Sequence, residues 1–373
     1  MQDESHNSES TQAGPLVSVM MPAFNAEKYI ALAIESVLAQ SYPHWELIVV
    51  DDGSVDRTGE IAAQYRDERI KIIRQPNGGE SAARNTALRH MQGELVAYLD
   101  ADDTLLPNHL ELTARYLQEH PELDAVYTDG YHCDPFGQLT QSLSSRRRGP
   151  FQGWIFEEVV RASDVFGPPT CVVLRREPIL RYGLEYDTRI VIGPDWDFFT
   201  RYAENARFGY IDQFTCLYRI HQTNITFSTG SERRALSLAM VREKAVKLSS
   251  FNKLSVRTRT AVFYDLLVNL LAEFPERQSR IVQWQEFHAL PKEERGALLR
   301  LMSSKAMLRG RIHPYIDRWL NQARVLNPMD QKARMLATLY SLSPTLCRFA
   351  LWMKSRSEAG AAELSPFNDQ NPS

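Results

Sequence analysis

The sequence lacks the features that identify several common classes of protein. It has no run of about eighteen apolar residues, so no segment is predicted to span a membrane. Its four cysteines are scattered and form no C-x-x-C pair, which argues against a zinc ribbon or a disulfide framework and is typical of a reducing compartment. The formal net charge of −3 provides no basic field for binding nucleic acid.

The two ends of the chain are polar. Residues 1–15 contain no apolar core of the kind found in a signal peptide, and residues 357–373 are also polar. We expect both ends to be disordered tails, because such segments bury too little apolar surface to fold. The absence of a signal sequence and the unpaired cysteines together predict a cytoplasmic protein.

Strand and helix patterns alternate in the first part of the chain. Helical spacing of apolar residues over 27–40 and a shorter helix over 58–65 separate the first strands. Apolar runs of the kind found in buried parallel strands occur at 17–21, 46–50, 70–73 and 95–99. This order predicts an α/β fold with a mostly parallel, doubly wound sheet.

Carboxylates follow two of these strands at the point where each ends. Asp51 and Asp52 follow one strand, and Asp100, Asp102 and Asp103 follow another. Open α/β sheets bind ligands at the carboxyl ends of their strands. Like charges so close together repel one another, and a hard cation such as Mg²⁺ or Mn²⁺ would relieve the repulsion. The alternative is a solvated acidic turn with one carboxylate capping the next helix.

Two glycines precede a predicted helix between these acidic segments. Gly78 and Gly79 could bring backbone N–H groups close to an anion, and Arg84 could add a fixed charge for a phosphate. A glycine turn with a surface arginine is an equally good interpretation of this segment alone. The spacing matches neither a Walker P-loop nor the G-x-G-x-x-G fingerprint, which disfavours a kinase or an NAD enzyme.

These motifs together resemble those of family 2 glycosyltransferases, which have the GT-A fold. The resemblance covers residues 17–130 and rests on four segments in the expected order: VSVMMPAFN from Val17, IVVDDGSVD from Ile48, NGG from Asn77 with ARN from Ala83, and LDADD from Leu99. It implies an inverting, metal-dependent enzyme that moves a sugar from a nucleotide-sugar donor, with UDP as the family's usual nucleotide.

The resemblance also implies roles for individual residues. Phe24 would stack on the base of the donor, Asp52 would accept a hydrogen bond from the base, and Asp102 would bind Mn²⁺ or Mg²⁺ at the diphosphate. Asp51 and Asp103 are expected to shape their loops instead. The residues expected to contact the nucleotide sugar are Pro22, Ala23, Phe24, Asp52, Arg84, Asp100 and Ala101.

Two further site residues are predicted from the region after residue 190. Asp195 follows Gly193 and Pro194 where the family commonly has Gly-Glu-Asp, so Asp195 is the candidate general base, while Pro194 replaces the glutamate. Helix capping is the alternative for Asp195 and for Asp197. His221 is the histidine of a Tyr-Arg-x-His motif that the family often has, and the resemblance implies that it lies near the metal and the diphosphate. Arg146–Arg148 is interpreted as a solvated loop in preference to an anion site.

The remainder of the chain is predicted to be helical and to contain no catalytic cluster. We expect a GT-A domain over 16–228 and a helical region over 229–356. Residues 301–356 hold ten Lys or Arg and two Asp, and 346–354 combine apolar and basic residues as an interfacial helix does. A basic, solvated helix is the alternative. The expected acceptor is a saccharide or a lipid-linked saccharide of cell-surface polysaccharide or glycolipid synthesis, with peripheral contact at the inner face of the membrane.

Two other functions compete with sugar transfer. A nucleotidyltransferase also uses carboxylates at a strand end, but the segment Met21–Asn25 lacks its glycine-rich, lysine-bearing signature. A catalytically degenerate GT-A scaffold is favoured only by Pro194. The presence of four aspartates favours an enzyme: Asp52, Asp100, Asp102 and Asp195.

Overall fold

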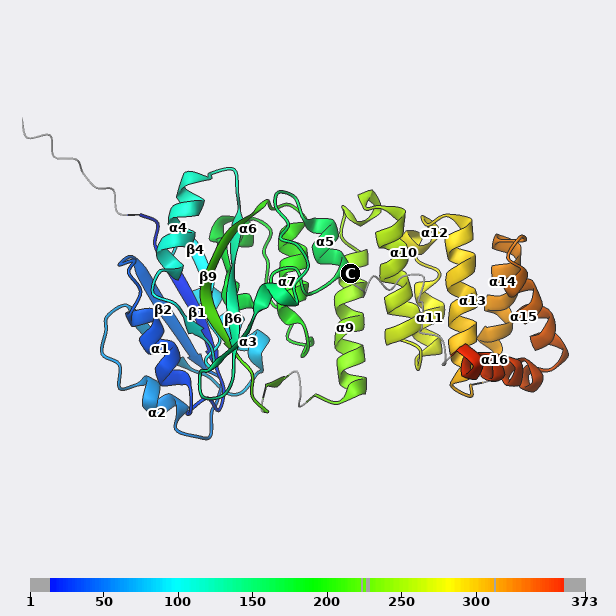
Figure 1. Ribbon diagram of the computed structural model, residues 1–373, viewed down its shortest axis with the longest axis horizontal. Coiled ribbons are helices and arrows are strands. Elements are labelled where there is room, and N and C mark those ends of the chain that lie inside the picture. The colour runs from blue at the N-terminus through cyan, green and yellow to red at the C-terminus, as the bar shows by residue number, and fades with distance from the viewer. Residues whose placement is uncertain (1–13, 223, 226–228, 312, 359–373) are drawn as a thin grey trace, which may run out of the picture. The chain divides into compact units, whose positions relative to one another are not determined.

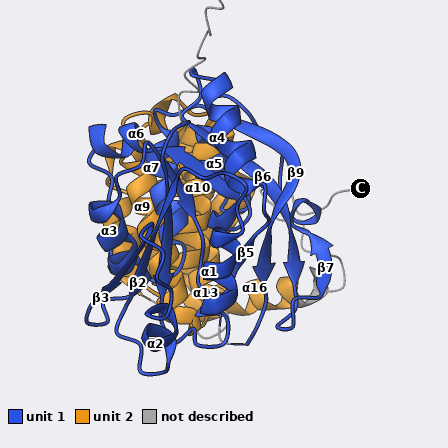
Figure 2. Cartoon of the chain, turned by 90° about the vertical axis from the view of Figure 1, so that its left-hand side faces the viewer, with its two compact units in different colours: residues 1–228 blue, residues 229–373 orange. Residues whose placement is uncertain are grey.

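The computed structural model describes residues 14–222, 224–225, 229–311 and 313–358 (Figure 1). The chain divides into two compact units, residues 1–228 and 229–373 (Figure 2). The two polar tails predicted at the ends lie almost wholly outside the described residues. Each unit is described by itself below.

The first four long strands of the first unit form a parallel sheet. They are β1 (Val17–Ala23), β2 (Trp45–Asp51), β3 (Ile70–Arg74) and β4 (Leu95–Tyr98), in the spatial order β3-β2-β1-β4. The connecting helices are α1 (Ile30–Leu38), α2 (Thr58–Ala62) and α3 (Glu80–His90). Right-handed connections place α1 and α2 on one face and α3 on the other, because the strand order reverses after β3. The doubly wound arrangement is therefore confirmed.

Beyond β4 the nine-stranded sheet is mixed. The strand β8 (Val172–Arg175) lies antiparallel between β4 and β6 (Ala125–Cys133), and β9 (Phe208–Arg219) runs parallel to β6. Two short strands complete it: β5 (Thr104–Leu105) pairs with β9, and β7 (Leu139–Ser142) pairs with β6. The prediction of parallel strands thus holds for the half of the sheet formed by β1–β4, and the second half adds antiparallel strands.

Short helices cover the rest of this unit, and its core lies under the parallel strands. Val19, Leu47 and Ala97 are among its fully buried residues. The helices are α4 (His109–Glu119), η1 (Leu143–Ser145), α5 (Phe156–Arg161), η2 (Pro169–Cys171), α6 (Arg176–Arg181) and α7 (Pro194–Ala203).

The arginine loop differs from its prediction at one position. The Arg147 side chain is buried, donates to the Thr128 carbonyl at 2.8 Å, and lies over the rings of Tyr127 and Tyr210. The Arg147 guanidinium is therefore hydrogen-bonded and stacked inside the unit, so the prediction of a solvated loop is wrong at this residue.

The second unit is helical, as predicted. In this unit α10 (Val256–Tyr264) is continued by the π-helical η4 (Asp265–Leu270). None of the described helices is both long and apolar enough to cross a membrane. The other elements are α9 (Ser231–Val246), η3 (Phe251–Lys253), α11 (Pro275–Ile281), α12 (Gln285–His288), α13 (Lys292–Leu308), α14 (Pro314–Leu326), α15 (Gln331–Leu342) and α16 (Pro344–Glu358).

Candidate functional site

The acidic segments meet where the strand order reverses. Strand β1 pairs with β2 on one side and with β4 on the other, all in parallel register. At the carboxyl end, Asp52 donates its N–H to the Ala23 carbonyl, and Leu99 donates its N–H to Met20. The loops after β1, β2 and β4 therefore open on one edge, at the topological switch point where such sheets bind ligands.

Phe24 leaves the end of β1 with its ring half-exposed, at 50%. The loop behind it is fixed, because the Asn25 N–H donates to Ser54 Oγ and Asn25 Oδ1 accepts from the Val55 N–H, each at 3.0 Å. Asn25 adopts φ +51°, a conformation that asparagine tolerates better than most residues. A rigid loop thus presents an apolar ring to solvent, as stacking on a flat base requires.

Asp52 is buried, and the chain itself occupies both of its carboxylate oxygens. They accept from the N–H groups of Gly78 and Gly79 and from Gln75 Nε2, at 2.6–3.2 Å. Gly79 adopts φ +86° as it leads into α3, a conformation that favours glycine. The direct structural role of Asp52 is to hold the glycine loop against β2, and a donor base would have to share this carboxylate.

Arg84 forms the only buried cation among the residues predicted for this site. Its side chain is 1% exposed, and Nη2 contacts Asp100 Oδ1 at 2.9 Å and Glu80 Oε1 at 2.8 Å. Its Nε and Nη1 have no hydrogen-bond partner within the described residues. The ring of Tyr186 lies 5.5 Å from the guanidinium carbon. Two nitrogens of this buried guanidinium therefore lack a hydrogen-bond partner, which is unusual for a buried polar group.

Glu80 is a site residue that the sequence did not single out. Burial raises its pKa to about 7, with further raising by Asp100 and Asp195, while Arg84 opposes the shift. Burial also raises the pKa of Asp100, whose neighbours Asp102 and Asp195 act in the same direction. The spacing of one helical turn between Glu80 and Arg84 is visible in the sequence. Charged pairs with this spacing are also common on exposed helices, so the spacing did not predict a buried site.

Asp102 and His221 lie side by side although they are far apart in sequence. His221 Nε2 is 2.9 Å from Asp102 Oδ2, and both side chains are partly exposed, at 12% and 28%. The His221 ring stacks on Tyr29, with centroids 5.1 Å apart, and the Arg219 guanidinium lies over the same Tyr29 ring. The predicted ligand pair is thus brought together at the end of β4.

The donor set at this point fits an open divalent-cation site. Among the described residues, no group of three or more His, Cys, Asp or Glu side chains is arranged to hold a metal. One carboxylate and one imidazole, both reachable from solvent, leave most coordination positions for water and for diphosphate oxygens. Mg²⁺ and related cations are commonly held in this way in nucleotide sites.

Asp103 and Arg219 fix the acidic segment from behind. Asp103 is buried and accepts from Thr170 Oγ1 at 2.7 Å and from the Arg219 N–H at 3.0 Å. Burial raises the pKa of Asp103, and Asp102 and Asp100 raise it further. Arg219 also donates from Nε to the Asp102 carbonyl at 3.0 Å. These contacts are those of a loop-shaping carboxylate.

The two aspartates at the start of α7 differ in their surroundings. Asp197 is buried and pairs with Arg201 at 2.7 Å, so its carboxylate is engaged within the helix. Asp195 is partly exposed, and its charge raises the pKa of both Glu80 and Asp100. Pro194 occupies the first turn of α7, where its fixed φ suits a helix start. The charge of Asp195 therefore acts on Glu80 and Asp100, and proline is compatible with its position before Asp195.

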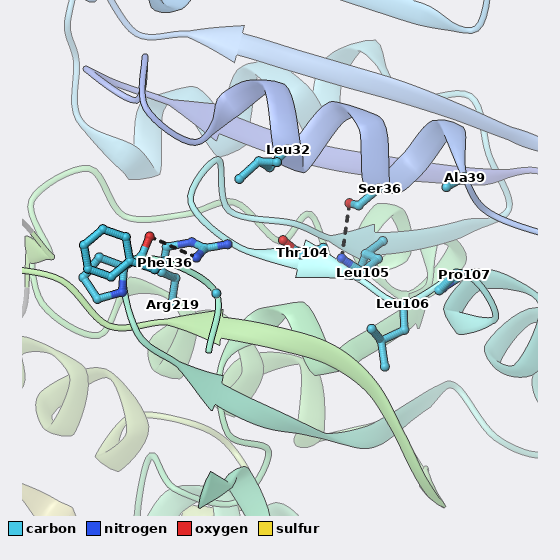
Figure 3. A pocket seen from close by; sticks show the side chains of 11 residues that line it. Leu32, Ser36, Ala39, Thr104, Leu105, Leu106, Pro107, Phe136 and Arg219 are labelled. Atoms are coloured by element: carbon cyan, nitrogen blue, oxygen red, sulfur yellow. Dashed lines mark hydrogen bonds between the residues drawn. The ribbon is translucent and has the colours of Figure 1, made fainter. Parts of the chain in front are cut away.

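A pocket that the sequence did not predict lies beside the turn that carries Asp102 and Asp103. It has a volume of about 470 Å³ and lies between α1, β5 and the turn at Phe136 (Figure 3). Leu32 and Phe136 form part of its lining, with Arg219 close to Phe136. Arg219 contributes to both the pocket and the support of Asp102, so the pocket lies behind the candidate metal ligands.

Comparisons with known proteins agree with this geometry. The family model described as glycosyl transferase family 2 matches residues 18–183. An uncharacterized glycosyltransferase of Methanocaldococcus jannaschii, MJ1057, is 31% identical over 214 residues, which are 55% of this chain and 71% of that protein. The Escherichia coli UDP-Glc:alpha-D-GlcNAc-diphosphoundecaprenol beta-1,3-glucosyltransferase WfgD is 45% identical over 98 residues, 26% of this chain and 39% of WfgD.

Similarity in structure extends along almost the whole chain. The crystal structure of Staphylococcus aureus TarS 1–349 in complex with UDP-GlcNAc matches with a TM-score of 0.57 at 17% identity, covering 96% of this chain and 98% of that chain. At this identity the likeness shows the fold alone. The chain spans about half or less of the lengths of the first curated relatives that it matches.

Proposed function

We propose, from the premise that the chain belongs to glycosyltransferase family 2, that it transfers a sugar from a nucleotide-sugar donor to a hydroxyl acceptor with inversion at the anomeric carbon. The observation that carries the proposal is the contact between Asp102 and His221 at the switch point of the sheet. The charge of Asp195 acts on the same acidic cluster.

The donor is proposed to bind along the edge formed by β1, β2 and β4. The exposed ring of Phe24 stacks on the base, with Pro22 and Ala23 forming the strand end beneath it. The loop held by Asp52 lies further along the same edge, and the buried guanidinium of Arg84 supports that edge through its contact with Asp100. We propose UDP as the nucleotide, supported by the UDP-sugars in the names of WfgD and of the TarS complex.

Asp102 and His221 are proposed to hold a divalent cation, Mn²⁺ or Mg²⁺, together with the donor's diphosphate. A cation bound there would supply positive charge to neutralise the departing diphosphate. Asp100 and Ala101 line the same turn, and Asp100 is fixed by Arg84. Asp103 keeps the turn in place from behind and is not proposed as a ligand.

Asp195 is proposed as the general base. It accepts the proton of the acceptor hydroxyl, whose oxygen forms the new bond to the anomeric carbon from the face opposite the leaving group. The bond from that carbon to the diphosphate oxygen breaks, and the nucleoside diphosphate leaves with the electron pair. A single displacement of this kind inverts configuration and needs no covalent enzyme intermediate.

The acceptor is proposed to be a saccharide, or a lipid-linked saccharide, of polysaccharide or glycolipid synthesis. WfgD is named for transfer to a sugar linked to diphosphoundecaprenol, which supports a lipid-linked acceptor. An acceptor of that kind places the enzyme at the cytoplasmic face of a membrane, in peripheral contact.

The test is donor binding and hydrolysis over a panel of nucleotide sugars, with Mn²⁺, Mg²⁺ or EDTA. We expect metal-dependent turnover of one donor, loss of donor binding in Asp102→Ala, and retained binding without turnover in Asp195→Asn. Asp212→Asn is the matched control, because this exposed aspartate of β9 contacts Tyr210 and none of the proposed site residues. If no nucleotide sugar binds to folded protein, the enzyme proposal fails and a scaffold role replaces it.

A further inference from the structure

Helix α16 carries two separate apolar faces. Cys347 is fully buried and, with Leu351, packs into a core cluster of the second unit that includes Leu320 and Leu336. Leu346 and Phe349 are instead 64% and 58% exposed. Met353 is also exposed. The inner face already joins the helix to the unit, so the outer face is not needed for the fold.

The exposed residues form one stripe along the helix. Successive residues of an α-helix are about 100° apart, so Leu346, Phe349 and Met353 lie within an arc of about 60°. Cys347 and Leu351 lie on the far side. Trp352 borders the stripe, with its ring stacked against that of Phe349 at 6.0 Å. We call Leu346, Phe349, Trp352 and Met353 the outer stripe.

Cations border the outer stripe on both sides. The exposed Arg348 lies next to Trp352 around the helix, and the exposed Lys354 lies on the opposite border. Residues 314–355 contain six Lys or Arg and two Asp, a formal net charge of +4. One of these aspartates, Asp330, pairs with Arg300 at 2.9 Å. The surroundings of the stripe are therefore basic.

The guanidinium of Arg348 lies beside Gly310, between two other cations of the basic region. Arg309 and Arg311 both contact Glu273, which offsets part of their charge. The basic segment predicted from sequence is therefore not a uniform charged surface. Exposed apolar residues also lie on other elements of this segment, among them Val325, Met329 and Leu342, whereas those on α16 share one side of the helix.

We propose that the outer stripe of α16 docks the protein on an anionic lipid bilayer. Apolar side chains enter the interface, tryptophan lies at the level of the headgroups, and the bordering Arg348 and Lys354 meet lipid phosphates. A second copy of the chain would be a poorer occupant, because a symmetric contact would bring these cations of both copies together. The docking itself does not depend on the proposed function. Its purpose does, because docking would keep the enzyme beside a lipid-linked acceptor.

The experiment is co-sedimentation of the full chain with vesicles of phosphatidylcholine, with and without phosphatidylglycerol. We expect binding that requires phosphatidylglycerol. The Phe349→Ser/Met353→Ser double variant should weaken it by about tenfold or more, because both side chains lose their apolar contact with the bilayer. Arg348→Gln should weaken it about fivefold. Leu180→Ser is the matched control, since Leu180 is a 62% exposed leucine on α6 of the first unit.

Two outcomes would overturn the proposal. One is unchanged sedimentation of the double variant. The other is a concentration-dependent dimer that the double variant abolishes, which would assign the stripe to self-association. Donor hydrolysis in lipid-free buffer is measured in parallel and should be the same in every stripe variant. If the unaltered protein hydrolyses no donor, the proposed function is refuted, but the docking result is unaffected.

Discussion

Replacement of Arg84 by methionine tests how the buried cation supports the site. Arg84 is 1% exposed, and its Nη2 contacts carboxylates of both Asp100 and Glu80 within 3 Å. Methionine fills a similar volume without charge. The variant therefore removes the cation and leaves two adjacent carboxylates beside an apolar side chain.

The expected loss of stability follows from these contacts. Removing one partner of a buried ion pair typically costs about 3–5 kcal/mol, because the remaining charge is left uncompensated. The side chains of Asp100 and Glu80 are 26% and 32% exposed, so water compensates part of the charge and we take the lower end, about 3 kcal/mol at pH 8.

The loss should depend on pH in a defined direction. The pKa of Glu80 is already raised to about 7 by burial, and Arg84 lowers it, so removing Arg84 raises it further. A raised folded-state pKa means that stability is gained as the pH falls and the carboxyl takes up a proton. The deficit of Arg84→Met relative to the wild type should therefore shrink between pH 8 and pH 6.

Urea unfolding at pH 8 and pH 6 measures both quantities. Arg89→Met is the control, because Arg89 is an exposed arginine of the same helix, and it should change stability by less than about 0.5 kcal/mol. In the Glu80→Gln background the cost of Arg84→Met should be smaller, since one of the two charges is already absent. A deficit below about 1 kcal/mol, or one that grows as the pH falls, would refute the reasoning.

Three further predictions concern single residues. Burial lowers the pKa of the fully buried His109 to about 4, so the folded protein should lose about 2 kcal/mol between pH 7 and pH 5, and His109→Gln should flatten that dependence in urea unfolding. Asp103→Ala should cost about 2–3 kcal/mol by leaving the Thr170 hydroxyl and the Arg219 N–H without their acceptor, and Asp103→Asn less, because a neutral side chain suits this burial; equal losses in thermal unfolding would contradict this. Asp195→Asn should lower kcat for sugar transfer by about 10²–10⁴-fold with little change in donor affinity, and a mere rise in KM would show that Asp195 only binds substrate.

The parallel half of the sheet could be predicted from sequence because its signal is local. Apolar runs such as that ending at Val50 alternate with helical spacing, and the acids follow each run directly. The second half gave a weaker signal. Strand β5 contains two residues, Thr104 and Leu105, which is too short for any periodicity, and its place is set by pairing with β9.

Burial of charged residues was the least predictable feature of the site. Arg84 and Arg147 both lie in polar stretches of sequence, yet both are buried. Arg147 is buried because rings from two separate strands, Tyr127 and Tyr210, enclose it. The partners of such residues come from distant segments of the chain. The polar residues that surround them in the sequence therefore predict, wrongly, that their side chains are exposed to solvent. His221 was placed near Asp102 only through the family resemblance, since nothing local in the sequence joins residues so far apart.

The support that Arg219 gives to the acidic segment has a consequence for recombining such enzymes. The family model ends at residue 183, before β9, whereas Arg219 grips both Asp102 and Asp103. In a hybrid protein joined at residue 183, Asp102 and Asp103 would come from this chain, and the residue in the position of Arg219 would come from the other protein. Such hybrids should work only when the incoming strand supplies an arginine and a histidine in the same register. A useful crossover point therefore lies beyond His221.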